Sequence, residues 1–110
     1  MKTENKGLKV RVSFVAYRDI GEHNRFDVTD FTEDIALVKN KISSQRAMGG
    51  ADMPEDVQGG FNKALGLSWS ADSIKSAFHI ADAPGHGKDI YDGGSFGDSY
   101  PKGSPDGFKI

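Results

Sequence analysis

Residues 8–17, with the sequence LKVRVSFVAY, decide the fold class of this chain. Apolar residues alternate with polar ones up to Ser13, and most of the apolar residues are β-branched or aromatic. A period of two residues with this composition predicts a β-strand. The polar face ends after Ser13, so we expect the end of the strand to be buried on both faces.

Residues 26–28 form a shorter alternating pattern, which fits either an edge strand or an extended loop. From residue 32 the spacing becomes helical, with Ile35, Val38 and Ile42 on one face. Asp30 and Glu33 have the spacing of a capping box. The double glycine at 49–50 is expected to end this helix.

A second helix is expected to start at residue 52, where Asp52 and Glu55 form another capping box around Pro54. Gly59 and Gly60 then lie inside the helix. Each glycine costs about 1 kcal/mol relative to alanine. We therefore expect another backbone to pack very close to this pair.

Residues 77–81, AFHIA, are a short apolar run that predicts a buried parallel strand with His79 as a core histidine. Residues 84–107 are rich in glycine and proline and lack periodicity, which is typical of a functional loop or of disorder. The order of elements predicts an α/β layer fold with a parallel sheet. A chain of 110 residues and 11.9 kDa has room for one domain.

Composition excludes several classes of protein. A net charge of −2 disfavours binding to nucleic-acid phosphates, and the absence of cysteine excludes disulfides and zinc-thiolate sites. No apolar run is long enough to span a bilayer. Residues 1–9 lack the apolar region of a secretory signal, so we expect a cytoplasmic protein, with an extracellular location as the alternative.

Acidic residues are expected to meet at the carboxyl ends of the strands, where open α/β sheets bind ligands. Asp19 and Asp82 each follow a predicted strand, and Asp52 and Glu55 begin the second helix. Carboxylates that converge repel one another unless a cation joins them, and Mg²⁺ or Mn²⁺ prefers such oxygen ligands. The alternatives are structural: Asp52 and Glu55 cap the helix, Asp82 forms a turn, and Asp19 is an ion-pair or turn residue.

An enzymatic interpretation competes with this one. His79, Asp82 and His86 have the spacing H-x2-D-x3-H, although His79 and Asp82 would point to opposite faces of a strand. His86 by itself is expected to be a loop residue. The alternative function is a metal-dependent hydrolase that uses Asp82, Glu55 and His86, with Glu55 as the base.

Three segments together resemble the von Willebrand factor A domain, and most closely the one found beside alpha-kinase domains. They are residues 12–19 (VSFVAYRD), 49–65 (GGADMPEDVQGGFNKAL) and 78–87 (FHIADAPGHG). The resemblance implies a doubly wound, Rossmann-like sheet flanked by helices. It covers residues 8–107, after a tail at 1–7 and with a Gly/Pro-rich loop at 84–107.

The same resemblance implies a metal-ion-dependent adhesion site for Mg²⁺ or Mn²⁺. Asp82 matches the acidic metal residue after the family's fourth strand. Asp52 and Glu55 fall in the loop that supplies a threonine in many members and a glutamate in integrin β subunits. The D-x-S-x-S segment of the family's first strand is not found, so we expect a partial domain with weak or no metal affinity.

The function that this resemblance implies is a non-enzymatic interaction module. The ion would keep one open position for a carboxylate of a protein partner. An accessory domain of an alpha-type serine/threonine kinase is a further alternative. The chain has no glycine-rich phosphate loop and no H-R-D stretch, so we expect no catalytic residues in it.

Overall fold

Two antiparallel strands lie at the centre of the computed structural model, which describes residues 7–49, 52–92 and 97–109. Strand β1 (Val12–Tyr17) pairs with β2 (Phe26–Thr32), with Tyr17 opposite Phe26 and a bulge near the start of β1. The strand predicted within residues 8–17 is confirmed over its second half. Residues 26–28 belong to a strand rather than an extended loop.

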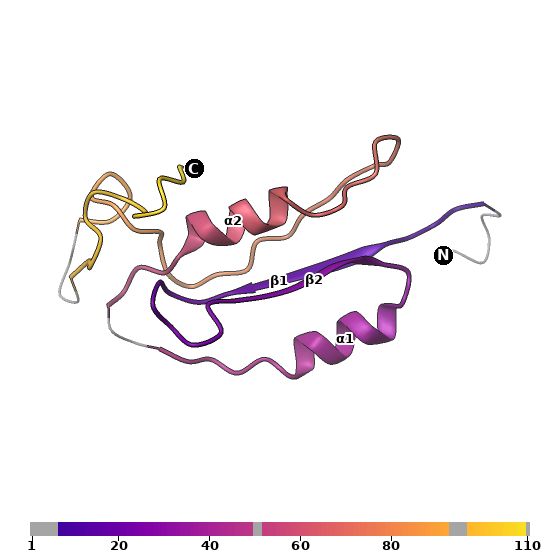
Figure 1. Cartoon of the computed structure of the whole chain (residues 1–110), viewed down its shortest axis with the longest axis horizontal. Helices are drawn as coiled ribbons and strands as arrows, with labels where there is room; N and C mark the ends of the chain where they lie inside the picture. The colour runs from indigo at the N-terminus through magenta and orange to yellow at the C-terminus, as the bar shows by residue number, and fades with distance from the viewer. Residues whose placement is uncertain (1–6, 50–51, 93–96, 110) are drawn as a thin grey trace.

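Helices α1 (Ile35–Ser43) and α2 (Val57–Leu65) lie on opposite sides of this hairpin (Figure 1). The chain is therefore a small α/β structure. Its one sheet within the described ranges is antiparallel, whereas a parallel sheet was expected. Both helices pack against β1, so the hairpin separates them.

Helix α1 begins four residues after the predicted cap. Its N-cap is Asp34, whose side chain accepts a hydrogen bond from the Leu37 N–H at 3.1 Å. Asp30 instead accepts hydrogen bonds from the N–H of Ser68 at 2.9 Å and from its hydroxyl at 2.6 Å. The helix ends at Ser43, before the predicted glycine stop.

Helix α2 also begins later than its sequence predicts. Asp56 is the N-cap and accepts a hydrogen bond from the Gly59 N–H at 3.1 Å. Glu55 lies outside the helix because its N–H donates to the Pro84 carbonyl at 2.8 Å and it forms an isolated parallel bridge with Gly85. The predicted capping box at Asp52 and Glu55 is wrong, and both carboxylates are free of capping.

The glycine pair in α2 allows two aromatic side chains to approach the helix. A Cβ atom on Gly60 would lie 2.6 Å from the Tyr17 ring, and one on Gly59 would lie 2.7 Å from Phe26. The prediction that another backbone packs here is wrong: the nearest atoms belong to side chains, namely the Asp56 carboxylate and the Phe26 ring at Gly59 and the Tyr17 ring at Gly60. These contacts allow α2 to pack closely against the two strands.

The apolar core is small. Val38 and Val57 are the only buried hydrophobic residues within the described ranges. The radius of gyration is 16.3 Å, against about 13 Å for a compact chain of this length. Much of the apolar surface is therefore not covered by the chain itself.

Residues 77–81 differ most from their prediction. They form no strand in the described structure, and Phe78 and Ile80 are 89% and 90% exposed. The segment runs between α2 and the hairpin (Figure 1). His79 is exposed, not a core residue, and its Nε2 lies 2.7 Å from the Tyr17 hydroxyl. No described strand pairs with the segment, and its side chains stay exposed, although the His79 ring lies 4.9 Å from the Phe61 ring.

Within the described ranges, no helix combines the length and apolar character needed to cross a membrane.

Substitution of Gly60 tests the close packing of α2 against the Tyr17 ring. Gly60→Ala should lower the free energy of unfolding by about 1–3 kcal/mol, because the new methyl group overlaps the Tyr17 ring. Gly66→Ala is the matched control, since its Cβ would meet backbone oxygens at an ordinary 3.6 Å. Urea denaturation measures both. Equal effects of the two substitutions would contradict this account of the packing.

Candidate functional site

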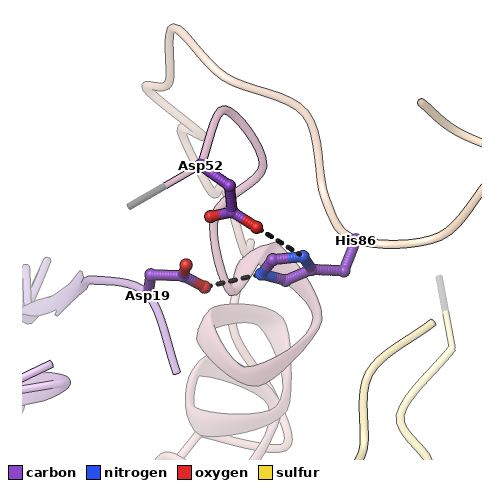
Figure 2. A group of neighbouring side chains, drawn as sticks. All are labelled: Asp19, Asp52 and His86. Atoms are coloured by element: carbon purple, nitrogen blue, oxygen red, sulfur yellow. Dashed lines mark hydrogen bonds and ion pairs between the residues drawn. The ribbon is translucent and has the colours of Figure 1, made fainter. Parts of the chain in front are cut away.

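Four segments that are distant in the sequence meet around His86, whose side chain is fully buried. Its Nε2 lies 2.6 Å from Asp19 Oδ1, and its Nδ1 lies 2.6 Å from Asp98 Oδ1. Asp52 Oδ2 is 3.9 Å from the same Nδ1. Figure 2 shows the carboxylates of Asp19 and Asp52 turned toward the ring. We call Asp19, Asp52, His86 and Asp98 the His86 cluster.

Helix α2 and its leading loop hold the backbone of His86. The Gln58 side-chain amide donates to the His86 carbonyl at 2.8 Å. The bridge between Glu55 and Gly85 fixes the preceding residue. Gly85 has no space for a side chain, because a Cβ there would lie 2.8 Å from Gln58 Oε1. The late start of α2 therefore helps to place the histidine.

Backbone N–H groups hold the three carboxylates. Asp19 Oδ1 accepts from Ile20 at 2.8 Å, and Asp52 Oδ2 accepts from Ser99 at 2.7 Å. Asp98 accepts from Gly87 and from Tyr100, both at 2.8 Å. The cluster is thus anchored by the loops before and after α2 and by the C-terminal region.

The electrostatics differ among the members of the cluster: the charged form is favoured at His86, Asp52 and Asp98, and the protonated form at Asp19. Burial opposes a charge on the ring, but hydrogen bonds to Asp19 and Asp98 outweigh it and raise the pKa of His86. Burial raises the pKa of Asp19. For Asp52 and Asp98, burial is outweighed by backbone N–H donors, from Ser99 and Gly87 respectively, and the pKa of each carboxyl is lowered.

Negative charge is in excess at this cluster. Three carboxylates face one imidazole, and no described lysine or arginine forms an ion pair with any of them. Asp52 Oδ1 is buried and has no hydrogen-bond partner among the described residues. Asp19, Asp52 and His86 offer ligand atoms that lie within 4.8 Å of one another, so this group can hold a metal ion.

The three residues predicted as metal ligands have different surroundings. Asp52 is in the His86 cluster. Glu55 lies beside the cluster, and burial followed by the charges of Asp19 and Asp52 raises its pKa to about 6. Asp82 is exposed, and no hydrogen bond or ion pair among the described residues joins it to Asp52 or Glu55. The three-residue ligand set stays a prediction.

Three residues of the His86 cluster lie outside the predicted ligand set of Asp52, Glu55 and Asp82. Asp19 was named among the carboxylates that converge at the carboxyl ends of the strands, with an ion-pair or turn role as the alternative. His86 was expected to be a loop residue, with a role in the alternative hydrolase as the competing interpretation. Asp98 lies in an aperiodic stretch that carries no signal.

Comparison with known proteins gives one informative match. The chain is 36% identical over 111 aligned residues to "Alpha-protein kinase vwkA" of Dictyostelium discoideum. The chain is homologous to a region of this kinase. The match covers the whole chain but only 17% of the length of the relative. No protein-family model and no solved structure matches the chain. The match confirms the expected relation to alpha-kinase proteins as homology to one region of such a protein.

The pH dependence of stability tests the environment of Glu55. Its pKa is about 6 in the folded chain against 4.5 for the free side chain, so the folded state favours the protonated form. This contribution to stability is complete below pH 4.5 and is lost as the pH rises through 6. Between pH 4.5 and 6.5 the wild type should lose up to about 1 kcal/mol relative to Glu55→Gln, after solvent screening.

Urea denaturation at several pH values measures this difference. Glu33→Gln, at an exposed position in the turn before α1, is the matched control and should show no such trend. A constant difference between the wild type and Glu55→Gln across this pH range would contradict the assigned environment.

Proposed function

We propose that this chain is part of a non-enzymatic interaction module of the von Willebrand A type in an alpha-kinase-like protein. A divalent cation bound at its carboxylate-rich end would accept an acidic group of a protein partner. The observation that carries this proposal is the buried Asp19, Asp52 and His86 group, with excess negative charge and an unpartnered Asp52 oxygen. The homology to a region of an alpha-protein kinase supports the protein class.

The ligands implied by the family resemblance fit only partly. Asp52 fits, because one of its oxygens is buried without a partner. Glu55 fits, because it lies within electrostatic range of Asp19 and Asp52. Asp82 is exposed, and its charge acts on Tyr17 together with that of Glu55, so its place in the ligand set stays a proposal. Asp52 belongs both to the ligand set that the resemblance implies and to the group that the structure brings together, so we propose it as a metal ligand. Mg²⁺ and Mn²⁺ are the ions that the resemblance implies.

Exposed apolar side chains support a role in association. Phe78, Ile80 and Ile74 are 89–100% exposed on one segment, and Leu65 at the end of α2 is 77% exposed. Several large apolar side chains exposed on one short segment are consistent with a face that another polypeptide covers. We propose that a further β-strand of the assembled protein covers residues 74–80 and extends the sheet toward the doubly wound form.

The kinase and hydrolase alternatives have different support. The relative is named a kinase, but this chain lacks a phosphate loop and an H-R-D stretch, so we propose an accessory role for it. A hydrolase is favoured by one observation, the pKa of about 6 for Glu55 beside a candidate metal site. A carboxylate with this pKa suits a general base near neutral pH.

Water proton relaxation with Mn²⁺ tests the module. Mn²⁺ with an open coordination position relaxes solvent protons more strongly when it is bound to the chain. A short glutamate-containing peptide should reduce this enhancement, because its carboxylate replaces the bound water. Asp52→Asn should lower the Mn²⁺ affinity at least roughly tenfold, since loss of a mere ligand-supporting group already costs that much.

Asp72→Asn, at an exposed position in the loop after α2, is the matched control and should leave Mn²⁺ binding unchanged. Asp82→Asn shows whether the exposed carboxylate belongs to the ligand set. Enhancement that is absent, or that carboxylates do not reduce, would refute the module. Hydrolytic turnover that Glu55→Ala removes would favour the enzyme instead.

A further inference from the structure

We propose that Asp19, Asp52 and His86 form a site for a zinc-type transition-metal ion rather than for Mg²⁺. The inference deepens the function proposed above and rests on it for the presence of a cation at this end of the molecule. It concerns which ion the site selects and how a fourth residue, Asp98, positions the histidine.

The nitrogen of His86 is the first reason. Mg²⁺ is held by oxygen ligands in octahedral geometry, whereas imidazole nitrogen suits zinc and its neighbours in the first transition row. Nε2 is fully buried and faces Asp19 Oδ1 at 2.6 Å. An ion at this position therefore meets a nitrogen together with carboxylate oxygens. The chain has no cysteine, so oxygen and imidazole nitrogen are its principal metal ligands.

The hydrogen bond from the other ring nitrogen is the second reason. A histidine that binds a metal ordinarily donates its second N–H to a carboxylate, which fixes the ring and its tautomer. Nδ1 of His86 lies 2.6 Å from Asp98 Oδ1, and Asp98 is held in turn by the N–H groups of Gly87 and Tyr100. Asp98 is thus a positioning residue, and an ion at Nε2 would take the place of the proton that Nε2 shares with Asp19.

Asp52 gives a third and independent reason. Its side chain is 4% exposed, and Oδ2 is held by the Ser99 N–H at 2.7 Å. Oδ1 is buried without a partner among the described residues. Figure 2 shows that this carboxylate faces Nδ1 of the ring, whereas that of Asp19 faces Nε2, and the ligand atoms of the three residues lie within 4.8 Å of one another. A buried carboxylate oxygen without a partner is costly unless a cation or donor meets it.

The charges agree with a dication. Three carboxyl groups, those of Asp19, Asp52 and Asp98, surround the ring, and no described lysine or arginine forms an ion pair with them. Three protein ligands leave the fourth tetrahedral position of zinc open. That position is where a water molecule, or the partner carboxylate of the proposed module, would bind.

Nitrogen NMR of the full chain tests the site directly. The chain has three histidines, His23, His79 and His86, and each reports its ring nitrogens separately. ZnCl₂ should shift Nε2 of His86 and saturate at one equivalent. Mg²⁺ at hundredfold higher concentration should leave that signal in place. Asp98→Asn should weaken Zn²⁺ binding about 10–100-fold.

Variants separate this site from surface binding. His86→Gln should abolish the one-equivalent Zn²⁺ binding, whereas His79→Gln, at an exposed histidine, should retain it. Because the His86→Gln substitution can also unfold the chain, the decisive measurement is the response of the wild-type ring nitrogens to Zn²⁺. Zn²⁺ shifts confined to His23 or His79, or an equal response of His86 to Mg²⁺, would overturn the inference.

The two proposals fail in different ways. If Mn²⁺ binds and a carboxylate displaces its water while His86 does not respond to Zn²⁺, the zinc-type site fails and the module stands. If Zn²⁺ shifts His86 but no carboxylate reaches the Mn²⁺-bound water, the ion site stands and the module fails.

Discussion

Burial of His86 between carboxylates is the constraint on which the carboxylate-rich end of this molecule depends. Asp19 and Asp98 each lie 2.6 Å from one ring nitrogen, and they arrive from the end of β1 and from the C-terminal region. A buried imidazole that lacked these acceptors would lose its hydrogen bonds without compensation from water. The loops that carry the carboxylates must therefore close around the ring, and this closure also brings Asp52 into the same space.

The apolar core contributes less to holding this structure together, because it is small. Val38 and Val57 are the only buried hydrophobic residues that the structure describes, while Phe78 and Ile80 remain almost wholly exposed. Burial of apolar area is the main favourable contribution to folding, so a small core implies a small margin of stability. The described elements are held together mainly by the pairing of β1 with β2, by the packing of the α2 glycines against the hairpin, and by the hydrogen bonds of the His86 cluster. Residues 74–80 carry the most exposed large hydrophobic side chains that the structure describes.

The start of α2 links the fold to the site. Asp56 caps the helix, and Arg25 holds its fully buried carboxylate through an ion pair at 2.6 Å. Because capping falls to Asp56, the carboxylates of Asp52 and Glu55 are available for other contacts. Glu55 instead pairs its backbone with Gly85, which places the next residue, His86, beside Asp52. Because the N-cap of α2 is Asp56 and not the predicted Asp52, the Asp52 side chain is free to join the His86 cluster.

The sequence by itself determined the elements with strong local periodicity: the strand at β1, the apolar face of α1 and the body of α2. It also pointed to acidic residues after a strand and before a helix, which is half of the site. Only the tertiary structure decided that Asp19, Asp52 and Asp98 meet around His86. Such convergence depends on loop closure between residues up to about eighty positions apart, and local spacing carries no information about it. The apolar run at 77–81 shows the converse, since its pattern is that of a buried strand but burial requires a neighbour that the described chain does not supply.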